Sequence, residues 1–356
     1  MTLVERTGTA PLFHSAPRNP HSARTPHDRR GPIREDDPVS AVRRPTTIPH
    51  GRTARRLEWP HLPPHIRSLI EQRCGSPVVE AISQGAGFTP GFASVLTCAD
   101  GSRHFVKAAS ARAQRMFAEA YREEARKLAG LPVEAPAPRL LWVHDTADPD
   151  DWVVLGIEHV PSRQPRRPWR AEDLAACLAM TERLAATLTP PPAGLVLDDF
   201  STEFAGWPAL WADVRREHAG RAAELAARFG EVAPGGTLVH TDIRDDNLML
   251  ADDGRVLLCD WNWPVVGAAW LDTLILLIGP RGDGLDVDAV LASSPLTRDL
   301  DPEAVDIVLA LVTGYFLSSA GQPVPPNSPH MRDAQRWQGE VCWEWLCERR
   351  GWRRPT

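Results

Sequence analysis

The chain of 356 residues is 43% hydrophobic and 24% charged, with a formal net charge of −6 at pH 7. This length and composition place it among globular proteins and leave room for two lobes, each with its own core. The longest uncharged apolar stretch, residues 307–320, is shorter than the roughly 18 residues that a bilayer span requires, so we expect a buried helix there and no membrane span.

The six cysteines contain no C-x-x-C pair. Their spacing therefore does not predict a zinc site, which needs closely arranged ligands, and reduced thiols in a cytoplasmic protein are expected instead. Arg29 and Arg30 are not followed by an apolar run, so a secretory signal is not expected either. The sequence leaves the oligomeric state open.

Residues 1–56 are rich in Pro, Arg, Thr and His, and Phe13 is their single aromatic residue. Such a segment cannot bury enough apolar surface to offset its conformational entropy, which predicts a disordered basic tail. A basic arm can bind nucleic acid or an acidic partner. Because no aromatic residues interleave with the arginines, nucleic-acid binding is not expected, and a solvated extension or a misassigned start codon is the preferred interpretation.

Residues 57–158 have the pattern of a small β-rich lobe. A short amphipathic helix is predicted over residues 63–73, followed by strands over residues 78–82 and 94–97. Gly85 and Gly87 lie in the turn between these strands. Glycine lets backbone N–H groups approach phosphate oxygens, so the turn is a candidate nucleotide-binding loop, with an ordinary hairpin as the alternative.

A third strand, residues 104–107, ends at Lys107. Only Lys107 and Lys127 are lysines among the 40 basic residues, which suggests that a compact ammonium group is needed there. A lysine at this distance from a glycine turn can pair with nucleotide phosphates; a surface lysine is the alternative. A helix predicted over residues 116–131 carries Glu123 and Glu124, both candidates for an ion pair with Lys107.

Two further strands, residues 136–142 and 152–158, complete this lobe, and residues 159–356 are predicted to form a mostly helical second lobe. A Pro/Arg linker is expected over residues 162–170 and a long loop over residues 189–208. Helices are expected over residues 171–188, 209–229, 271–277, 307–320 and 331–347.

Residues 239–260 read VHTDIRDDNLMLADDGRVLLCD. His240, Asp242 and Asn247 give H-x-D-x-x-x-x-N, and a predicted hairpin follows and ends at Asp260. An Asp on such a loop can accept the proton of an attacking hydroxyl, while the Asn and the strand-end Asp can hold the magnesium that neutralises nucleotide phosphates. These residues also occur by chance as turns and caps, but the hairpin favours the chemical interpretation.

The segments HTDIRDDNLML and CDWNWPVVGAAWLD resemble the aminoglycoside phosphotransferase and choline-kinase-like family, the small-molecule branch of the protein-kinase fold. The resemblance implies an α+β, protein-kinase-like two-lobe fold, with a small antiparallel β-sheet in the N-lobe and a mostly helical C-lobe. It implies Asp242 as the catalytic base, Asn247 and Asp260 as Mg²⁺ ligands, and Asp272 as a structural acid. The nucleotide would be ATP or GTP.

The resemblance also assigns residues in the nucleotide lobe. The family's E-A-x-x-L pattern falls on residues 124–128, which selects Glu124 as the partner of Lys107. Glu158, His159 and Val160 would form the hinge whose backbone groups meet the adenine edge.

Arg244 lies two residues beyond the expected base. Protein kinases carry a lysine there that contacts the transferred phosphoryl group, and Arg244 could make that contact with a bidentate fork. A local ion pair with Asp245 or Asp246 is the alternative. His240 is interpreted as a structural residue and not as a base.

Three functions remain open. The first is ATP-dependent phosphoryl transfer to a hydroxyl of a small molecule such as an aminoglycoside, an amino alcohol or a sugar. The second is a protein kinase, which is disfavoured because residues 260–262 are Asp-Trp-Asn and not Asp-Phe-Gly. The third is a nucleotide-binding protein without catalysis, for which replacement of the expected site residues would be typical, and none is replaced.

The acceptor is not identified by the sequence. A polycation would be bound by acids and a quaternary ammonium by aromatic rings, and the chain offers both. Tryptophans at helical spacing are more often core residues than a cage. The two mixed clusters are Asp198, Asp199, Glu203 and Asp213 with Trp207 and Trp211, and Glu340, Glu344 and Glu348 with Trp337, Trp343 and Trp345.

Overall fold

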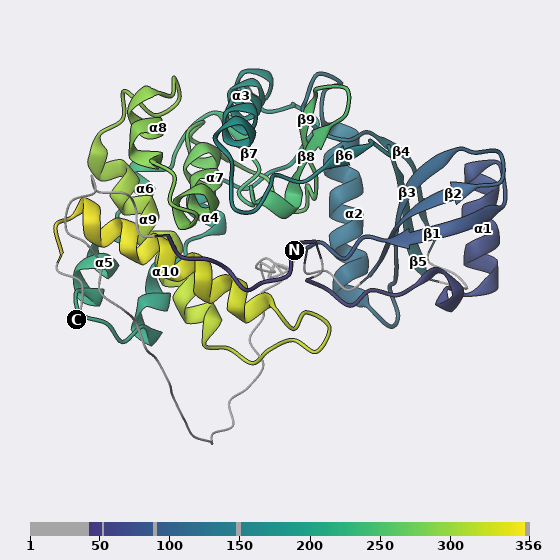
Figure 1. Cartoon of the computed structure of the whole chain (residues 1–356), viewed down its shortest axis with the longest axis horizontal. Helices are drawn as coiled ribbons and strands as arrows, with labels where there is room; N and C mark the ends of the chain where they lie inside the picture. The colour runs from purple at the N-terminus through teal and green to yellow at the C-terminus, as the bar shows by residue number, and fades with distance from the viewer. Residues whose placement is uncertain (1–42, 52, 88–90, 147–150, 353–356) are drawn as a thin grey trace, which may run out of the picture.

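The computed structural model describes residues 43–51, 53–87, 91–146 and 151–352. They form an α+β structure of two lobes (Figure 1), with a β-sheet lobe at one end and a mostly helical lobe at the other. This is the two-lobe arrangement expected from the sequence, with a cleft between the lobes.

The N-lobe is a five-stranded antiparallel sheet in the order β1-β2-β3-β5-β4. Its strands are β1 (Val78–Ser83), β2 (Phe92–Cys98), β3 (Arg103–Ser110), β4 (Leu140–Asp145) and β5 (Trp152–Ile157), and its helices are α1 (Pro64–Cys74) and α2 (Arg115–Gly130). A short 3-10 turn, η1 (Trp59–His61), precedes α1.

The two helices cover opposite faces of this sheet (Figure 1). Side chains alternate along β3: Val106 and Ala108 pack in the core beneath α1, whereas Ala109 packs against residues of α2. Because successive strand residues point to opposite faces, Lys107 lies on the α2 face, where Glu124 can reach it. The strand period therefore sets the position of the lysine.

Two strands, β3 and β4, differ from the predicted ones by three or more residues at a boundary. β3 continues past Lys107 to Ser110 because its pairing with β5 extends to Trp152. β4 begins at Leu140 and not at residue 136. Pro136 and Pro138 occupy the missing part, and proline cannot donate to a strand ladder.

The C-lobe has a helical frame around three short strand pairs. Its helices include α3 (Ala171–Thr187), α7 (Leu271–Gly282), α8 (Val287–Ser293), α9 (Pro302–Ala320) and α10 (Met331–Arg349). Its strands are β6 (Ser162–Arg163), β7 (Thr237–Val239), β8 (Leu248–Ala251), β9 (Val256–Leu258) and β10 (Val265–Gly267), which pair as β6-β8-β9 and β10-β7. The sequence patterns did not predict α8, β6 or β10, which are short.

Helix α9 is the only helix, among the residues that the structure describes, long and apolar enough to cross a membrane. Its apolar window is 83% buried inside the protein, which is typical of a core helix. It starts at Pro302. The side chain of the preceding residue, Asp301, caps the helix by accepting a hydrogen bond from the backbone N–H of Glu303, and proline is favourable at the first helical position.

The single helix predicted over residues 209–229 is wrong. The structure has three short pieces there: η2 (Trp207–Asp213), α5 (Ala219–Ala226) and α6 (Phe229–Val232), with α4 (Phe200–Glu203) before them. His218 has a left-handed φ of 64°, which ends any continuous helix. The indole of Trp211 donates to the carbonyl of Ala310 at 3.0 Å, so tertiary packing on α9 prevails over helix propensity.

The predicted disorder of residues 1–56 is wrong for the N-terminal strap, defined here as residues 43–51 and 53–56; residues 1–42 lie outside the described residues. The strap starts beside α10, where the Trp337 indole donates to the carbonyl of Arg44 at 2.8 Å, and reaches the glycine turn (Figure 1). There the backbone N–H of Thr53 donates to Gly85 at 2.8 Å. Backbone hydrogen bonds and ion pairs hold the strap. The disorder prediction did not account for them because it was based on apolar content.

Candidate active site

The loop after β7 is held by a buried carboxylate. Asp272, at the start of α7, accepts hydrogen bonds from the backbone N–H groups of His240 at 2.8 Å and Thr241 at 2.9 Å. Thr241 has a φ of 68°, a strained conformation that these bonds help to hold. Burial raises the pKa of Asp272 to about 6, while the two backbone bonds oppose that rise.

We predict that Asp272→Asn destabilises the protein by about 1–3 kcal/mol, since the amide can accept only one of the two backbone bonds and places its own N–H groups against the other donor. Urea denaturation would measure the change. Asp301→Asn is the matched control, because asparagine caps a helix as well as aspartate. Equal stability of the two variants would contradict the structural role of Asp272.

His240 is packed in the interior and does not face the cleft. Its ring lies 4.8 Å from that of Trp261, edge to face, and its Nε2 lies 3.0 Å from the carbonyl of Cys259. Burial lowers the pKa of His240 to about 4, so the imidazole is neutral at pH 7. This geometry agrees with the interpretation of His240 as a structural residue.

Asp242 lines a smaller cavity between the N-terminal strap and the catalytic loop, as Arg244 does, and 41% of its side chain is exposed. The Asn247 amide donates to its backbone carbonyl at 2.9 Å and to its Oδ2 at 3.1 Å. Desolvation raises the pKa of Asp242 to about 7, and Arg244 opposes the rise. A carboxyl group with a pKa near the working pH is suited to accepting a proton.

Arg244 bridges two carboxylates of the loop. Its Nε lies 3.2 Å from Asp242 Oδ1 and 3.1 Å from Asp246 Oδ1, so the local ion pair left open by the sequence is present. The other candidate partner, Asp245, pairs instead with Arg167 and with His50 of the strap. Arg244 nevertheless lies beside the carboxylate of Asp242.

Lys107 joins the two lobes electrostatically. Its Nζ lies 2.7 Å from both carboxylate oxygens of Glu124 and 3.1 Å from Asp260 Oδ1. Burial opposes the charge, but Asp260 and Glu124 together raise the pKa of Lys107 above its usual value. Burial likewise opposes ionisation of Asp260, yet Lys107 holds the pKa of Asp260 below its usual range. Lysine and aspartate are therefore both charged.

Asp260 is oriented by its local backbone. It follows β9 with a left-handed φ of 69°, and Asn262 donates to its Oδ1 at 2.8 Å. The backbone N–H of Cys259 donates to the carbonyl of Asn247 at 3.0 Å, which ties the two expected metal ligands to one frame. The hairpin predicted from the sequence makes this connection.

A cleft of about 540 Å³ opens between the lobes, within the range of small-molecule sites. Gly85 is not among its lining residues; its carbonyl accepts backbone bonds from the strap. The Glu158 side chain pairs with Arg139 at 3.2 Å, so backbone groups are what the hinge can offer a ligand. Expected site residues that line the cleft are Gly87, Lys107, Glu124, Glu158, His159, Val160, Asn247 and Asp260.

The strap contributes residues that the sequence did not single out. Arg56 lines the cleft and donates to the carbonyl of Ala86 in the glycine turn at 2.6 Å. Its positive charge lowers the pKa of Asp260, after the larger effect of Lys107. No local pattern marks Arg56, because its role depends on the strap folding back across both lobes.

We predict that Arg56→Ala raises the KM for the nucleotide about tenfold. Arg56 would donate a charge-assisted hydrogen bond to a nucleotide phosphate, and such a bond contributes about 1.5–3 kcal/mol. Arg55 is the matched control because its side chain is exposed. Steady-state kinetics of both variants at saturating acceptor would check this. A nucleotide KM that is the same for Arg56→Ala and Arg55→Ala would exclude a phosphate-binding role.

Most residues of the second acid and tryptophan cluster make internal contacts, and Trp337 lines the smaller cavity beside Asp242. Trp343 and Trp345 are buried in the C-lobe core. The glutamates are paired with arginines: Glu340 with Arg216, Glu344 with Arg44, and Glu348 with Arg281. In the first cluster Trp211 is buried, and Trp207 stacks on Tyr315 with ring centroids 3.9 Å apart.

A β-sheet lobe with a Lys–Glu pair, joined to a helical lobe that presents an H-x-D-x-x-x-x-N loop and a strand-end Asp, defines a kinase-like phosphotransferase. Residues 84–305 match the model of the phosphotransferase enzyme family, APH, and the chain belongs to this family. It is a small-molecule kinase. A search of curated proteins found no match.

Solved structures show the same fold. An aminoglycoside phosphotransferase, APH(4)-Ia, in a ternary complex with ADP and hygromycin B is similar with a TM-score of 0.54 and 12% identity, over 79% of this chain and 97% of that one. Spectinomycin phosphotransferase, APH(9)-Ia, with ADP and spectinomycin has a TM-score of 0.52 and 10% identity, over 79% and 98%. At these identities the similarity concerns the fold.

Proposed function

We propose that this enzyme transfers the γ-phosphoryl group of ATP to a hydroxyl of a small molecule, in the cytoplasm. The observation that carries the proposal is that two sets of hydrogen-bonded side chains lie on one frame. Lys107 pairs with Glu124 and Asp260, and Asn247 binds Asp242, five positions earlier in the same loop. The backbone bond from Cys259 to Asn247 connects the two sets.

The nucleotide would occupy the cleft of about 540 Å³. Lys107 would pair with its α- and β-phosphates, oriented by Glu124, which is 1% exposed and so held firmly in place. Gly87, with a φ of 78°, would bring the backbone groups of the turn between β1 and β2 close to the phosphates. Gly85 would contribute by fixing the turn on the strap. The adenine would meet backbone groups of the hinge, residues 158–160.

Asn247 and Asp260 fit a magnesium ion by the chemistry of their donors, since Mg²⁺ prefers oxygen ligands. The Asn247 amide nitrogen is bonded to Asp242, so its oxygen is the atom that can face a cation. Magnesium held there would neutralise charge on the phosphates. Lys107 and Arg56 supply further positive charge from the protein itself.

Asp242 would accept the proton of the acceptor hydroxyl as the hydroxyl oxygen bonds to the γ-phosphorus. The bond from that phosphorus to the bridging oxygen breaks, and ADP leaves. Arg244, which lies 3.2 Å from Asp242, would keep the carboxylate ionised and contact the transferred phosphoryl group. Phosphoryl transfer needs mainly positioning and charge stabilisation, which these residues provide.

The acceptor would be an aminoglycoside, an amino alcohol or a sugar-like molecule. The cavity enclosed by the strap and the catalytic loop measures about 80 Å³, which holds only a few water molecules. A multi-ring aminoglycoside therefore has to approach Asp242 from the open cleft or displace the strap. Both large and small acceptors consequently belong in the test.

The test is a screen for acceptor-stimulated ADP release with ATP, and with GTP in parallel. We expect one chemical class to stimulate release and to yield a phosphorylated product by mass spectrometry. Asp242→Asn serves as the control, because stimulation that survives this substitution comes either from a contaminating kinase or from an enzyme in which Asp242 is not the base. Failure of every acceptor, with nucleotide binding intact, would favour a binding protein without catalysis.

A further inference from the structure

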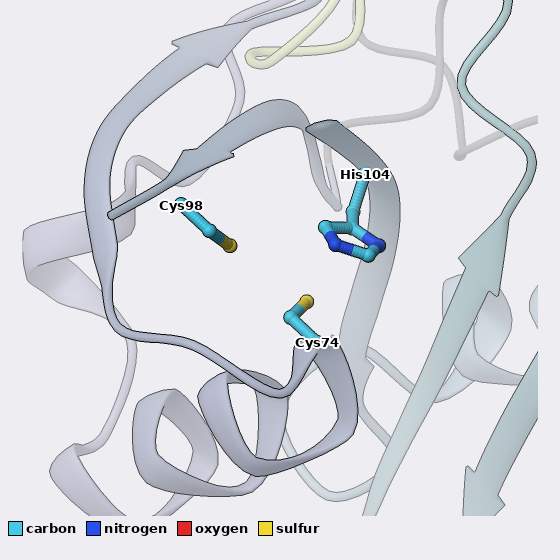
Figure 2. A group of neighbouring side chains, drawn as sticks. All are labelled: Cys74, Cys98 and His104. Carbon is cyan, nitrogen blue, oxygen red and sulfur yellow. The ribbon is translucent and has the colours of Figure 1, made fainter. Parts of the chain in front are cut away.

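Three side chains that could hold a metal converge on the face of the N-lobe sheet opposite to Lys107. Cys74 comes from the end of α1, Cys98 from the end of β2, and His104 from β3; Figure 2 shows them pointing toward one another. Their ligand atoms all lie within 4.8 Å of one another. The C-x-x-C criterion missed this cluster because the ligands come from three elements that meet only in the fold.

The strand pairing explains the convergence. His104 is paired with Leu96 in the β2–β3 ladder, and the backbone N–H of Cys98 donates to Ser102 at 2.9 Å. Cys98 and His104 therefore project from neighbouring strands onto the α1 face, which is the face of Leu96. The end of α1 then brings Cys74 over them.

A polar chain supports the imidazole. The Ser102 hydroxyl lies 3.0 Å from His104 Nε2 and donates to Asp100 Oδ1 at 2.7 Å. Metal-binding histidines are commonly oriented through such a hydroxyl or carboxylate partner. The backbone N–H of Asp100 in turn donates to the Ser76 hydroxyl at 3.2 Å, which connects this turn to the segment after α1.

The alternative role for two neighbouring cysteines is a reactive thiol. Cys98 is buried and Cys74 is half-buried, so neither thiol is freely accessible to solvent. A reactive cysteine typically lies in a partly exposed, electropositive environment. Two thiols and an imidazole in a partly buried site are instead the donor set that zinc prefers.

We propose that Cys74, Cys98 and His104 bind a Zn²⁺ ion, with solvent in the fourth position. Each thiol releases its proton to solvent as it becomes a thiolate ligand, and the neutral imidazole binds through a nitrogen lone pair. The ion ties the end of α1 to the β2–β3 turn. It lies on the other face of the sheet from Lys107 and is independent of the proposed phosphoryl transfer.

The experiment measures metal and not activity. The full-length protein, purified without chelators, would be analysed for zinc by mass spectrometry, and zinc affinity would be measured by competition with a chromophoric chelator. We expect one zinc ion per chain, and cobalt substitution should give the sulfur-to-metal charge-transfer absorption of thiolate ligands. Cys74→Ser and Cys98→Ser should lose both signals.

Three further variants keep the test informative if Cys98→Ser does not fold. His104→Gln should lose zinc, whereas His144→Gln, on β4 of the same sheet and similarly half-buried, should retain it. Ser102→Ala should weaken zinc binding by about 10–100-fold, as expected for a residue that orients a ligand. Free thiols without bound zinc, a Cys74–Cys98 disulfide, or zinc retained by His104→Gln would each overturn the proposal.

Discussion

Replacement of Asp242 by asparagine is expected to lower kcat about 10³-fold and to leave the affinity for the nucleotide nearly unchanged. Asparagine has the shape of aspartate, and Asn247 can still donate to the side-chain oxygen at this position. What the variant loses is the ability to take the proton of the acceptor hydroxyl. The loss therefore appears in turnover and not in nucleotide binding.

Single-turnover kinetics and nucleotide titration would separate these two quantities. Asp252→Asn is the matched control, since Asp252 is an exposed residue that lines the inter-lobe cleft and has no expected role in proton transfer. Turnover that survives in Asp242→Asn would reject its assignment as the base. A parallel loss of nucleotide affinity would instead indicate a structural disturbance of the loop.

The pH dependence gives a separate prediction for the same carboxylate. Because desolvation raises the pKa of Asp242 to about 7, kcat/KM for the acceptor should fall as the pH drops through this region and the base becomes protonated. Arg244 lowers this pKa, so Arg244→Gln should move the acidic limb to higher pH. A pH profile of both enzymes would check the direction, and an unmoved limb would contradict the coupling.

The active-site loop could be predicted from the sequence because its information is local. The spacing of Asp242 and Asn247 and the hairpin that ends at Asp260 all lie within 22 residues of one another. The strand and helix patterns also predicted a partner for Lys107, but they left Glu123 and Glu124 both open, and the family's E-A-x-x-L pattern selected Glu124. The geometry follows once these elements pack.

The missed features depend on contacts between distant segments. The strap is held by Trp337 and Gly85, far from it in the chain, and its composition alone indicated disorder. The helix predicted over residues 209–229 is broken by the docking of Trp211 on α9, which no local pattern reveals. The Cys74, Cys98 and His104 cluster likewise requires the register of β2 on β3.

The second large effect is expected at Asp260, which pairs with Lys107 across the cleft. Asp260→Asn is expected to weaken Mg²⁺-dependent nucleotide binding about 100-fold. The substitution removes the anionic oxygen ligand of the expected magnesium site, and a roughly 100-fold loss of affinity corresponds to about 3 kcal/mol. Asn262 and Lys107 would both lose a carboxylate acceptor.

Comparison with Glu124→Gln distinguishes a metal ligand from an ion-pair partner. Both substitutions remove a carboxylate that contacts Lys107, at 2.7 Å for Glu124 and 3.1 Å for Asp260. If Asp260 holds the cation, nucleotide binding by Asp260→Asn no longer increases when Mg²⁺ is added, whereas Glu124→Gln binds more weakly but still responds to Mg²⁺. Titrations of nucleotide with and without Mg²⁺ would measure this. An equal response to Mg²⁺ in both variants would show that Asp260 acts only through Lys107.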